Sequence, residues 1–420
     1  METIYLDHNA TTQPLPEVLE AMLQCEREAP ANPSSQHRAG RKARQRLEDA
    51  REGIAEILGA RLGTPGDQLI FTSGGTEANN LALFGLLPEV PPGADPRRLA
   101  RLAVSAIEHP SVAEVADYLK RQGWPVSRLG VDRSGALKAS EVQRWLAGEP
   151  TEYDSQNPST KELKEQATEQ PALPPVALIS VMLGNNETGV LQPVADVVAA
   201  VRRCESPSQV LVHTDAVQVV GKLPVNFAQL GVDALTFSGH KFHGPKGIGG
   251  LLIRQDMDLK PRLFGGFQQA GKRPGTEPVS LAVGMHVALQ HWQREAEARA
   301  RRLAELRDRF EAGLRAAGLN IVVHGAEGPR LPHTSNISFL GHNRQSLLMA
   351  LDLAGVACST GSACASGSTD PSPALLAMGV EQAAWESALR FSLGCFTTAV
   401  EVDLAVQRIS SVVNNLEKRH

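Results

Sequence analysis

The segment Ala234–Lys241 reads ALTFSGHK, a short apolar run that ends directly in small polar residues and a lysine. Its first four residues have the length and side chains of a buried strand. In open α/β sheets the carboxyl ends of the strands border the ligand cleft, so Lys241 is predicted to point into such a cleft. An ordinary surface lysine is the simpler alternative. The glycine-rich return over residues 244–250 makes that alternative less attractive, because glycines let the backbone approach a ligand closely.

Similar strand candidates alternate with helical patterns through the first two thirds of the chain. Several are near-continuous apolar runs, which are typical of a parallel sheet covered by helices on both faces. The segment Thr76–Leu87, which lies between the strand candidates Gln68–Thr72 and Leu102–Ser105, has a helical pattern. The fold class is therefore predicted to be α/β. The other strand candidates are Gln68–Thr72, Leu102–Ser105, Val176–Leu183, Val210–Thr214 and Gly249–Ile253.

The texture of the sequence changes in its last third. Arg294–Leu314 is rich in Arg, Glu, Ala and Leu and predicts a long amphipathic helix, and Val400–Leu416 predicts a second one. A mixed α/β region lies between them. We therefore predict a large domain over residues 14–263 and a smaller α/β domain formed by residues 1–13 and 264–420.

Two stretches look like surface insertions. Residues 88–98 (PEVPPGADPRR) are rich in proline. Residues 148–175 are polar, contain few large apolar side chains and end in proline. A segment that cannot bury apolar surface is expected to be solvated or disordered, and this interpretation is favoured over a docking role.

The composition excludes several classes of protein. The 420 residues are 42% hydrophobic and 21% charged, so the chain can bury a large core. A net charge of −4 and an aromatic content of 4% argue against nucleic-acid binding. No run of 18 or more apolar residues occurs, and Glu2 and Asp7 do not fit a signal peptide. Five scattered cysteines without a CxxC pair fit neither a disulfide scaffold nor a metal site, and they favour a cytoplasmic location.

Polar motifs follow several of the predicted strands. The SGGT motif at residues 73–76 lies between a strand and a helix, where free N–H groups favour a phosphate, although this pattern alone is weak. Asp215 either pairs with a protonated ring nitrogen, as pyridoxal phosphate (PLP) requires, or caps the next helix. His109 and Asn186 also follow strands. Together with Lys241 they have the layout expected of a PLP site.

The same motifs resemble those of a known family. In chain order they are SGGTEANN (73–80), EHPSV (108–112), NNETG (185–189), HTDAVQ (213–218), SGHK (238–241), RPGTEP (273–278), GSAC (361–364) and LRFSLG (389–394). This set resembles the cysteine desulfurases, which are class-V aminotransferases of PLP fold type I. The resemblance runs from Tyr5 to beyond Arg390. It implies a large domain with a mostly parallel seven-stranded sheet and a smaller α/β C-terminal domain.

The resemblance assigns cofactor-binding roles. It implies that Lys241 carries PLP as a Schiff base, that Asp215 pairs with the ring nitrogen, and that His109 stacks over the ring and moves protons. Thr276 would reach the phosphate bound in the other subunit, which implies an obligate homodimer. The cofactor-binding positions implied in this way are Gly75, Thr76, His109, Asn186, Asp215, Gln218, Ser238, His240, Lys241 and Thr276.

The resemblance also implies a substrate and a reaction. Arg390 would bind the carboxylate of L-cysteine beside Asn186. The enzyme would release L-alanine, keep the sulfur as a persulfide, and pass it to an acceptor such as an iron–sulfur scaffold protein or a thiolation pathway. The nucleophile would be Cys364, in a loop of small polar residues at about 355–371 that is expected to be mobile. The implied catalytic residues are Lys241, Cys364 and His109.

Related activities remain as alternatives. A selenocysteine lyase has a similar sequence throughout, whereas another class-V aminotransferase or lyase would not need Cys364. A non-enzymatic protein on an inactive fold is disfavoured, because every motif residue is present. Two positions depart from the family pattern: Cys395 stands where relatives commonly have arginine, and residues 264–269 (FGGFQQ) differ from the usual GGGQE.

Overall fold

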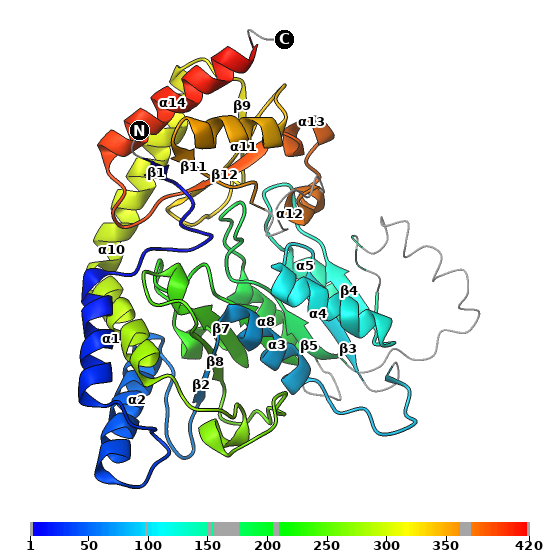
Figure 1. The fold of residues 1–420 in the computed structure, drawn as a ribbon. Coiled ribbons are helices and arrows are strands. Elements are labelled where there is room, and N and C mark those ends of the chain that lie inside the picture. Colours follow the sequence, from blue (N-terminus) through cyan, green and yellow to red (C-terminus); the bar gives the residue numbers. More distant parts are fainter. Residues whose placement is uncertain are drawn as a thin grey trace.

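The computed structural model describes residues 3–96, 100–149, 151, 153, 176–204, 210–361 and 371–417. A seven-stranded sheet with the order β2-β8-β7-β6-β5-β3-β4 lies at its centre (Figure 1). β8 is antiparallel to both neighbours and all other neighbouring strands are parallel, which confirms the predicted α/β class. In sheet order the strands are β2 (Gln68–Thr72), β8 (Gly249–Ile253), β7 (Ala234–Ser238), β6 (Leu211–Asp215), β5 (Val176–Ser180), β3 (Arg101–Ser105) and β4 (Val126–Leu129).

The sequence predicted six of these strands and missed β4. β4 reads VSRL, and only Leu129 in it is buried, so its pattern is too polar to stand out. β5 ends at Ser180, before the predicted end at Leu183. The chain nevertheless stays beside β6, because the N–H of Leu183 still donates to the carbonyl of Asp215 at 2.8 Å.

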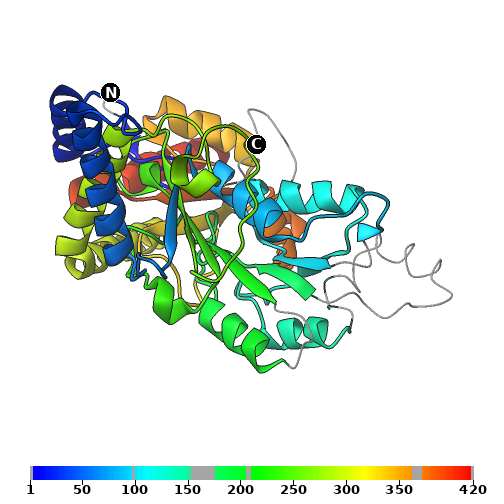
Figure 2. The ribbon, with the colours of Figure 1, turned by 90° about the horizontal axis from the view of Figure 1, so that it is seen from below.

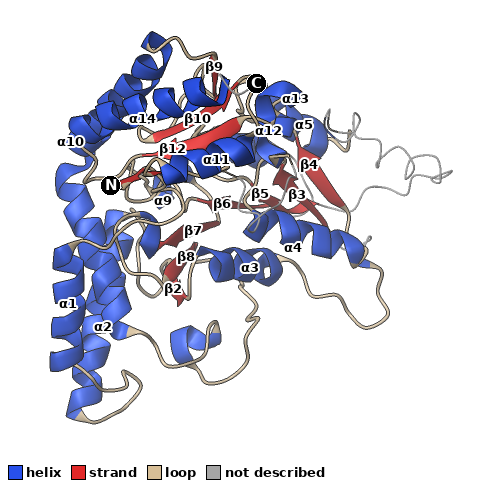
Figure 3. Cartoon of the chain, turned by 45° about the horizontal axis from the view of Figure 1, so that its top comes forward, coloured by secondary structure: helices blue, strands red, loops and turns tan. Residues whose placement is uncertain are grey.

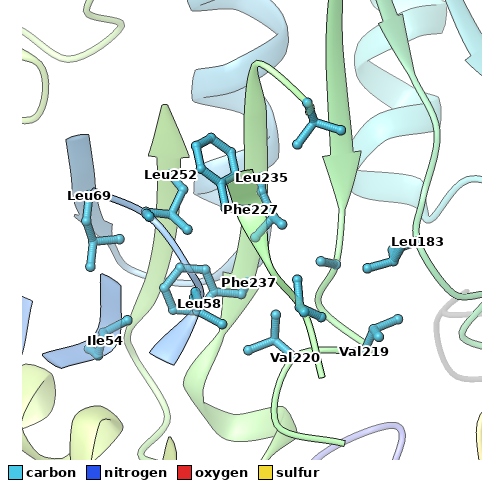
Figure 4. Close-up of a cluster of buried hydrophobic side chains, with 14 of the residues drawn as sticks. Ile54, Leu58, Leu69, Leu183, Val219, Val220, Phe227, Leu235, Phe237 and Leu252 are labelled. Carbon is cyan, nitrogen blue, oxygen red and sulfur yellow. The ribbon is translucent and has the colours of Figure 1, made fainter. Parts of the chain in front are cut away.

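Helices cover both faces of the sheet, as near-continuous apolar strands require. α3 (Gly75–Leu86) and α4 (Pro110–Arg121) cover one face (Figures 1 and 3). Figure 4 shows part of the core on the other face, where Phe237 of β7 and Leu252 of β8 lie near Ile54 and Leu58. The helices that contribute to this second core are α1 (Pro16–Glu28), α2 (Arg38–Ile57), α5 (Ala139–Leu146), α8 (Val194–Arg203), α9 (Phe227–Leu230) and α10 (Val279–Ala316).

The long helix α10 connects two parts of the molecule. It contacts α1 and α2, beside which it lies in Figures 1 and 2, and it also contacts α14 (Ala399–Glu417). It begins at Val279, whereas the sequence predicted a start at Arg294. The first turns were missed because they are mostly apolar and lack the charge pattern of an exposed helix. Since α10 packs on elements from both predicted domains, the boundary near residue 264 stays a prediction.

A smaller antiparallel sheet of the order β12-β10-β9 packs on the second half of α10. Phe310 of α10 and Phe391 of β12 illustrate the packing, with their ring centroids 5.0 Å apart. The elements of this part are β9 (Ile321–His324), β10 (Thr334–Phe339), α11 (Arg344–Leu353), β11 (Val356–Ala357), α12 (Pro373–Ala377), α13 (Gln382–Trp385) and β12 (Ala388–Ser392).

The N-terminal segment runs from the smaller sheet to the carboxyl end of β7. β1 (Ile4–Tyr5) pairs in parallel with β11, and Asp7 bridges to Ser392 of β12. A few residues later, the N–H of Thr12 donates to the carbonyl of His240 at 2.9 Å. The segment therefore lies beside the turn that carries the predicted cofactor lysine.

The two predicted insertions differ in what the structure describes. The first is at least partly exposed from residue 88 to residue 96, as predicted. Almost all of the second, residues 148–175, lies outside the described residues. In the described part of the chain, no helix has both the length and the apolar character that a membrane crossing requires.

Candidate active site

Nine of the ten predicted cofactor-binding residues line one cavity at the carboxyl ends of β6 and β7. Its volume is about 240 Å³. The turn after β2, the start of α4 and the segment after β5 complete its wall. The lining residues are Gly75, Thr76, Asn79, His109, Ser111, Met182, Asn186, Asp215, Val217, Gln218, Ser238, His240 and Lys241.

Lys241 lies in the short 3-10 turn Gly239–Lys241 that follows β7 directly. Its Nζ donates to the carbonyls of Asn9 and Ala10 at 2.6 and 2.9 Å. Burial, and secondly the positive charge of Arg390, lower the pKa of Lys241 to about 8. A sizeable fraction of the amine is therefore uncharged near neutral pH, as a nucleophilic or basic lysine requires.

Asp215 ends β6 and presents a hydrogen-bonded carboxylate to the cavity. Its Oδ1 accepts the N–H of Val217 at 2.9 Å, and its Oδ2 accepts Nδ2 of Asn79 at 2.7 Å. Asp215 therefore caps the following turn and also lines the cavity, and its pairing with a ring nitrogen stays a prediction. Its contacts are all with donors, which suits a carboxylate that pairs with a protonated ring nitrogen.

Gln218 is held by two partners behind the cavity wall. Its Nε2 donates to the carbonyl of Asn9 at 3.1 Å, and its Oε1 accepts Nζ of Lys222 at 3.0 Å. Burial, followed by the charges of Lys241 and Arg390, holds the pKa of Lys222 well below its usual value. Since Asn9 takes only one hydrogen of the amide nitrogen, the second hydrogen of Gln218 Nε2 remains for a ligand.

The turn between β2 and α3 brings backbone close to the cavity. A Cβ added at Gly75 would lie 2.8 Å from Cγ2 of Val217, so the wall has no room for a side chain there. On the facing strand end, the Oγ of Ser238 is buried and has no hydrogen-bond partner within the described chain. His240 lines the same region, and burial followed by the charge of Lys241 lowers its pKa to about 4.

Arg390 lies in β12, next to the cavity rather than in its wall. Its Nη2 donates to Oδ1 of Asp7 at 2.7 Å, and its Nη1 donates to the carbonyl of Asn186 at 3.0 Å. Its Nε is buried and makes no hydrogen bond to the described residues. The guanidinium is therefore held in place from two sides, and its buried Nε–H remains for a further acceptor.

Thr276 is a predicted cofactor-binding residue that does not line this cavity. Thr276 is exposed on the surface of the chain. Cys364 lies outside the described residues, as does most of its predicted loop.

Cys395 is half-buried beside the large core, and burial raises the pKa of its thiol to about 11, so an inert thiol fits better than a reactive one. Four described cysteines, Cys25, Cys204, Cys358 and Cys395, are free thiols.

The sequence analysis missed several residues of the site. Asn79 and Ser111 were inside quoted motifs, and the spacing of Asn79 three residues after Thr76 on a predicted helix was a usable signal. Asn9 and Lys222 had no such signal. Asn9 contacts Lys241 only because the tertiary fold brings the two together. Lys222 lies four residues after Gln218, in a stretch whose sequence predicted no helix.

Comparisons with known proteins point to one family. The family model of the class-V aminotransferases matches residues 4–154 and 154–404. A cysteine desulfurase from Enterobacter agglomerans is 37% identical over 420 residues, which cover 99% of this chain and 94% of that protein. A solved NifS-like protein has a TM-score of 0.80 at 31% identity and covers 98% of this chain and 100% of its own. The structure of SspA in complex with cysteine has a TM-score of 0.74 at 30% identity, with 94% and 100% covered.

Proposed function

Because the chain belongs to the cysteine desulfurases of the class-V aminotransferase family, we propose that it binds PLP at Lys241 and desulfurates L-cysteine. The observation that carries this proposal is the amine of Lys241, which lines the cavity together with Asp215 and has a pKa of about 8. A partly uncharged amine is a nucleophile for the aldehyde group of PLP. The solved relative SspA, which was determined in complex with cysteine, supports the same substrate here.

The residues of the cavity fit this cofactor. The unpartnered Oγ of Ser238 and the first N–H groups of α3 after Gly75 would hold its phosphate. Asp215 would hold the ring nitrogen, and the amide nitrogen of Gln218 would hold the ring oxygen. When bound, PLP supplies an electron sink that stabilises negative charge at the substrate Cα. Thr76, His109, Asn186 and His240 would complete the set.

The residues of the chain would bind the substrate and transfer its protons. Arg390 would bind the substrate carboxylate, because its guanidinium is already fixed by Asp7 and keeps a buried donor. Lys241 would remove the proton from the substrate Cα, since its amine is partly uncharged near neutral pH. The N-terminal segment holds both residues by hydrogen bonds. The base and the arginine that binds the substrate carboxylate therefore keep fixed positions relative to each other.

Cys364 would accept the sulfur. Its thiolate forms a bond to the substrate sulfur as the substrate Cβ–S bond breaks, and the electron pair of that bond stays on carbon. The proton lost by the enzyme thiol is made up at Cβ, and the proton that Lys241 removed returns to Cα, so that cysteine and the enzyme thiol become alanine and an enzyme persulfide. We propose a sulfur-acceptor protein, such as an iron–sulfur scaffold, as the next recipient, in a cytoplasmic setting that suits free thiols.

We also propose a homodimer. Thr276 is exposed and does not line the cavity of its own chain, which fits a residue that serves the site of another subunit. Nearby, Phe264 and Phe267 are 87% and 94% exposed. Two neighbouring aromatic side chains this exposed are typical of a surface that another protein chain covers.

A pair of cysteine variants tests the proposed function. Cys364→Ala is expected to abolish sulfide release from L-cysteine and to keep the absorbance of bound PLP. The matched control, Cys395→Ala, removes a thiol that is held protonated by burial and is expected to keep both. Full sulfide release by Cys364→Ala would refute the proposal.

The alternative activities are less well supported. The curated relative named above is a cysteine desulfurase, not a selenocysteine lyase or an aminotransferase. Steady-state rates with L-cysteine and L-selenocysteine separate the first two activities. Negligible turnover of L-cysteine beside rapid turnover of L-selenocysteine would favour the lyase.

A further inference from the structure

A continuous chain of hydrogen bonds joins His109 to Asp215 through two residues that the mechanism above leaves without a role. Asn79 is 1% exposed, and its Nδ2 donates to Oδ2 of Asp215 at 2.7 Å and to Oγ of Ser111 at 2.8 Å. The same Ser111 Oγ lies 2.8 Å from Nδ1 of His109. The backbone N–H of Ser111 also donates to this Nδ1, at 3.1 Å, because His109 is the N-cap of α4.

The chemistry of these groups fixes the direction of every bond in the chain. A carboxylate only accepts hydrogen bonds, so the end of the Asn79 amide that faces Asp215 must be its nitrogen. The second hydrogen of this nitrogen is donated to Ser111. The Ser111 hydroxyl therefore has its own hydrogen left for its other neighbour, Nδ1 of His109.

Nδ1 of His109 consequently accepts two hydrogen bonds and carries no proton. A backbone N–H can only donate, and the hydroxyl of Ser111 is turned to donate as well. A neutral imidazole has one proton, which must then reside on Nε2, the ring nitrogen on the side away from Ser111. His109 lines the cavity, so this N–H is the polar group that it offers there.

We propose that Asn79 and Ser111 are positioning residues that fix the proton of His109 on Nε2, so that His109 serves as a hydrogen-bond donor and not as the base for Cys364. This inference rests on the proposed function, because it concerns the same reaction. To act as a base, the imidazole would have to take a proton at Nδ1 and expel both donors of Ser111. A neutral donor at Nε2 instead stabilises negative charge on the substrate.

Taken together, the surroundings of His109 lower the pKa of its ring. Asp215 favours the protonated ring, whereas Lys241 and Arg390 oppose it. Burial is the largest effect, and together with the two cations it lowers the pKa of His109. The ring therefore stays neutral near physiological pH, which is the state in which the position of its single proton matters.

The tautomer can be measured directly in the holoenzyme. In protein with ¹⁵N-labelled histidine side chains, the His109 signals are assigned by their loss in His109→Gln. We expect an unprotonated Nδ1 and a protonated Nε2 between about pH 6 and pH 8. A protonated Nδ1, or an imidazolium at neutral pH, would overturn the inference.

Two variants of Ser111 separate its hydroxyl from a structural role. Ser111→Ala removes one of the two donors to Nδ1 and is expected to reveal a population protonated at Nδ1 toward the acidic end of that range. Ser111→Thr keeps the hydroxyl and is expected to match the wild type. Identical spectra for Ser111→Ala and the wild type would remove Ser111 from the proposal.

A second measurement tests the consequence for Cys364. The pH dependence of Cys364 alkylation by iodoacetamide, followed on its peptide by mass spectrometry, reports the protonation of its thiol. We expect the same midpoint in the wild type and in His109→Gln, and a clear upward shift would show that His109 is the base after all. PLP absorbance and sulfide release are recorded on the same samples. Their absence in the wild type would refute the proposed function, whereas the tautomer would stand or fall by its own signals.

Discussion

If PLP binds at Lys241 as proposed, the surroundings of this lysine are expected to set the pH dependence of its capture by the apoenzyme. With a pKa of about 8, about one Lys241 amine in ten is uncharged at pH 7, against about one in 3,000 for an ordinary lysine. Only the uncharged amine attacks an aldehyde, so the capture rate is expected to fall about tenfold per pH unit below the midpoint and to level off above it. Stopped-flow absorbance with the apoenzyme gives the rate, and a model amine reacted with the same PLP corrects for the titration of PLP itself.

Arg390 is the perturbation that tests this electrostatic account. Its positive charge is the second cause of the lowered pKa of Lys241, after burial. Arg390→Gln is therefore expected to raise the midpoint above 8, although not to that of a free lysine, because the burial remains. Arg390→Lys keeps the charge and is expected to keep the midpoint, and a thermal melt of each variant checks its folding. A wild-type midpoint above about 10, or an unchanged midpoint in Arg390→Gln, would refute the reasoning.

Three further predictions concern the stability of the fold that holds the site. Gly250→Ala would bring a Cβ within 2.3 Å of Cζ of Phe237 and is expected to cost about 1–3 kcal/mol in urea unfolding, whereas Gly328→Ala, whose nearest atom is at 3.6 Å, should cost little. Asp233→Asn leaves two arginines without a fully buried carboxylate and is expected to cost about 3 kcal/mol in the same assay. Burial raises the pKa of Glu108 to about 8, so the native state holds a proton that the unfolded chain releases near pH 4.5. The stability of the wild type relative to Glu108→Gln is therefore expected to fall by about 1.4 kcal/mol per pH unit as pH rises through this window, and a constant difference would contradict it.

The sheet was predictable because its strands are buried on both faces. Runs such as Ala234–Phe237 are mostly apolar and buried throughout, and several are followed by polar residues at the edge where ligands bind. When strands alternate with helices, the carboxyl ends of the parallel strands lie at the same edge of the sheet. The proximity of Lys241, Asp215 and Ser238 therefore followed from chain position alone, and the structure brings all three to one cavity.

The supports of these residues were not predictable in the same way. Asn9 accepts the hydrogen bond of Lys241 across 232 positions of sequence, and no local pattern encodes such a contact. The orientation of Gln218 depends on Lys222, whose side chain is read from sequence as an ordinary surface lysine. β4 escaped prediction because half of its side chains are polar. The roles given to Thr276 and Cys364 stay predictions, since one concerns a second subunit and the other lies outside the described residues.

The central claim is that Lys241 holds PLP covalently, and one measurement tests it most directly. The holoenzyme is reduced with borohydride, digested and mapped by mass spectrometry. The account predicts a phosphopyridoxyl group on Lys241 and none on Lys222, the lysine that bonds Gln218 of the cavity wall. A modified Lys222, or an unmodified Lys241 in protein that had bound PLP, would contradict it.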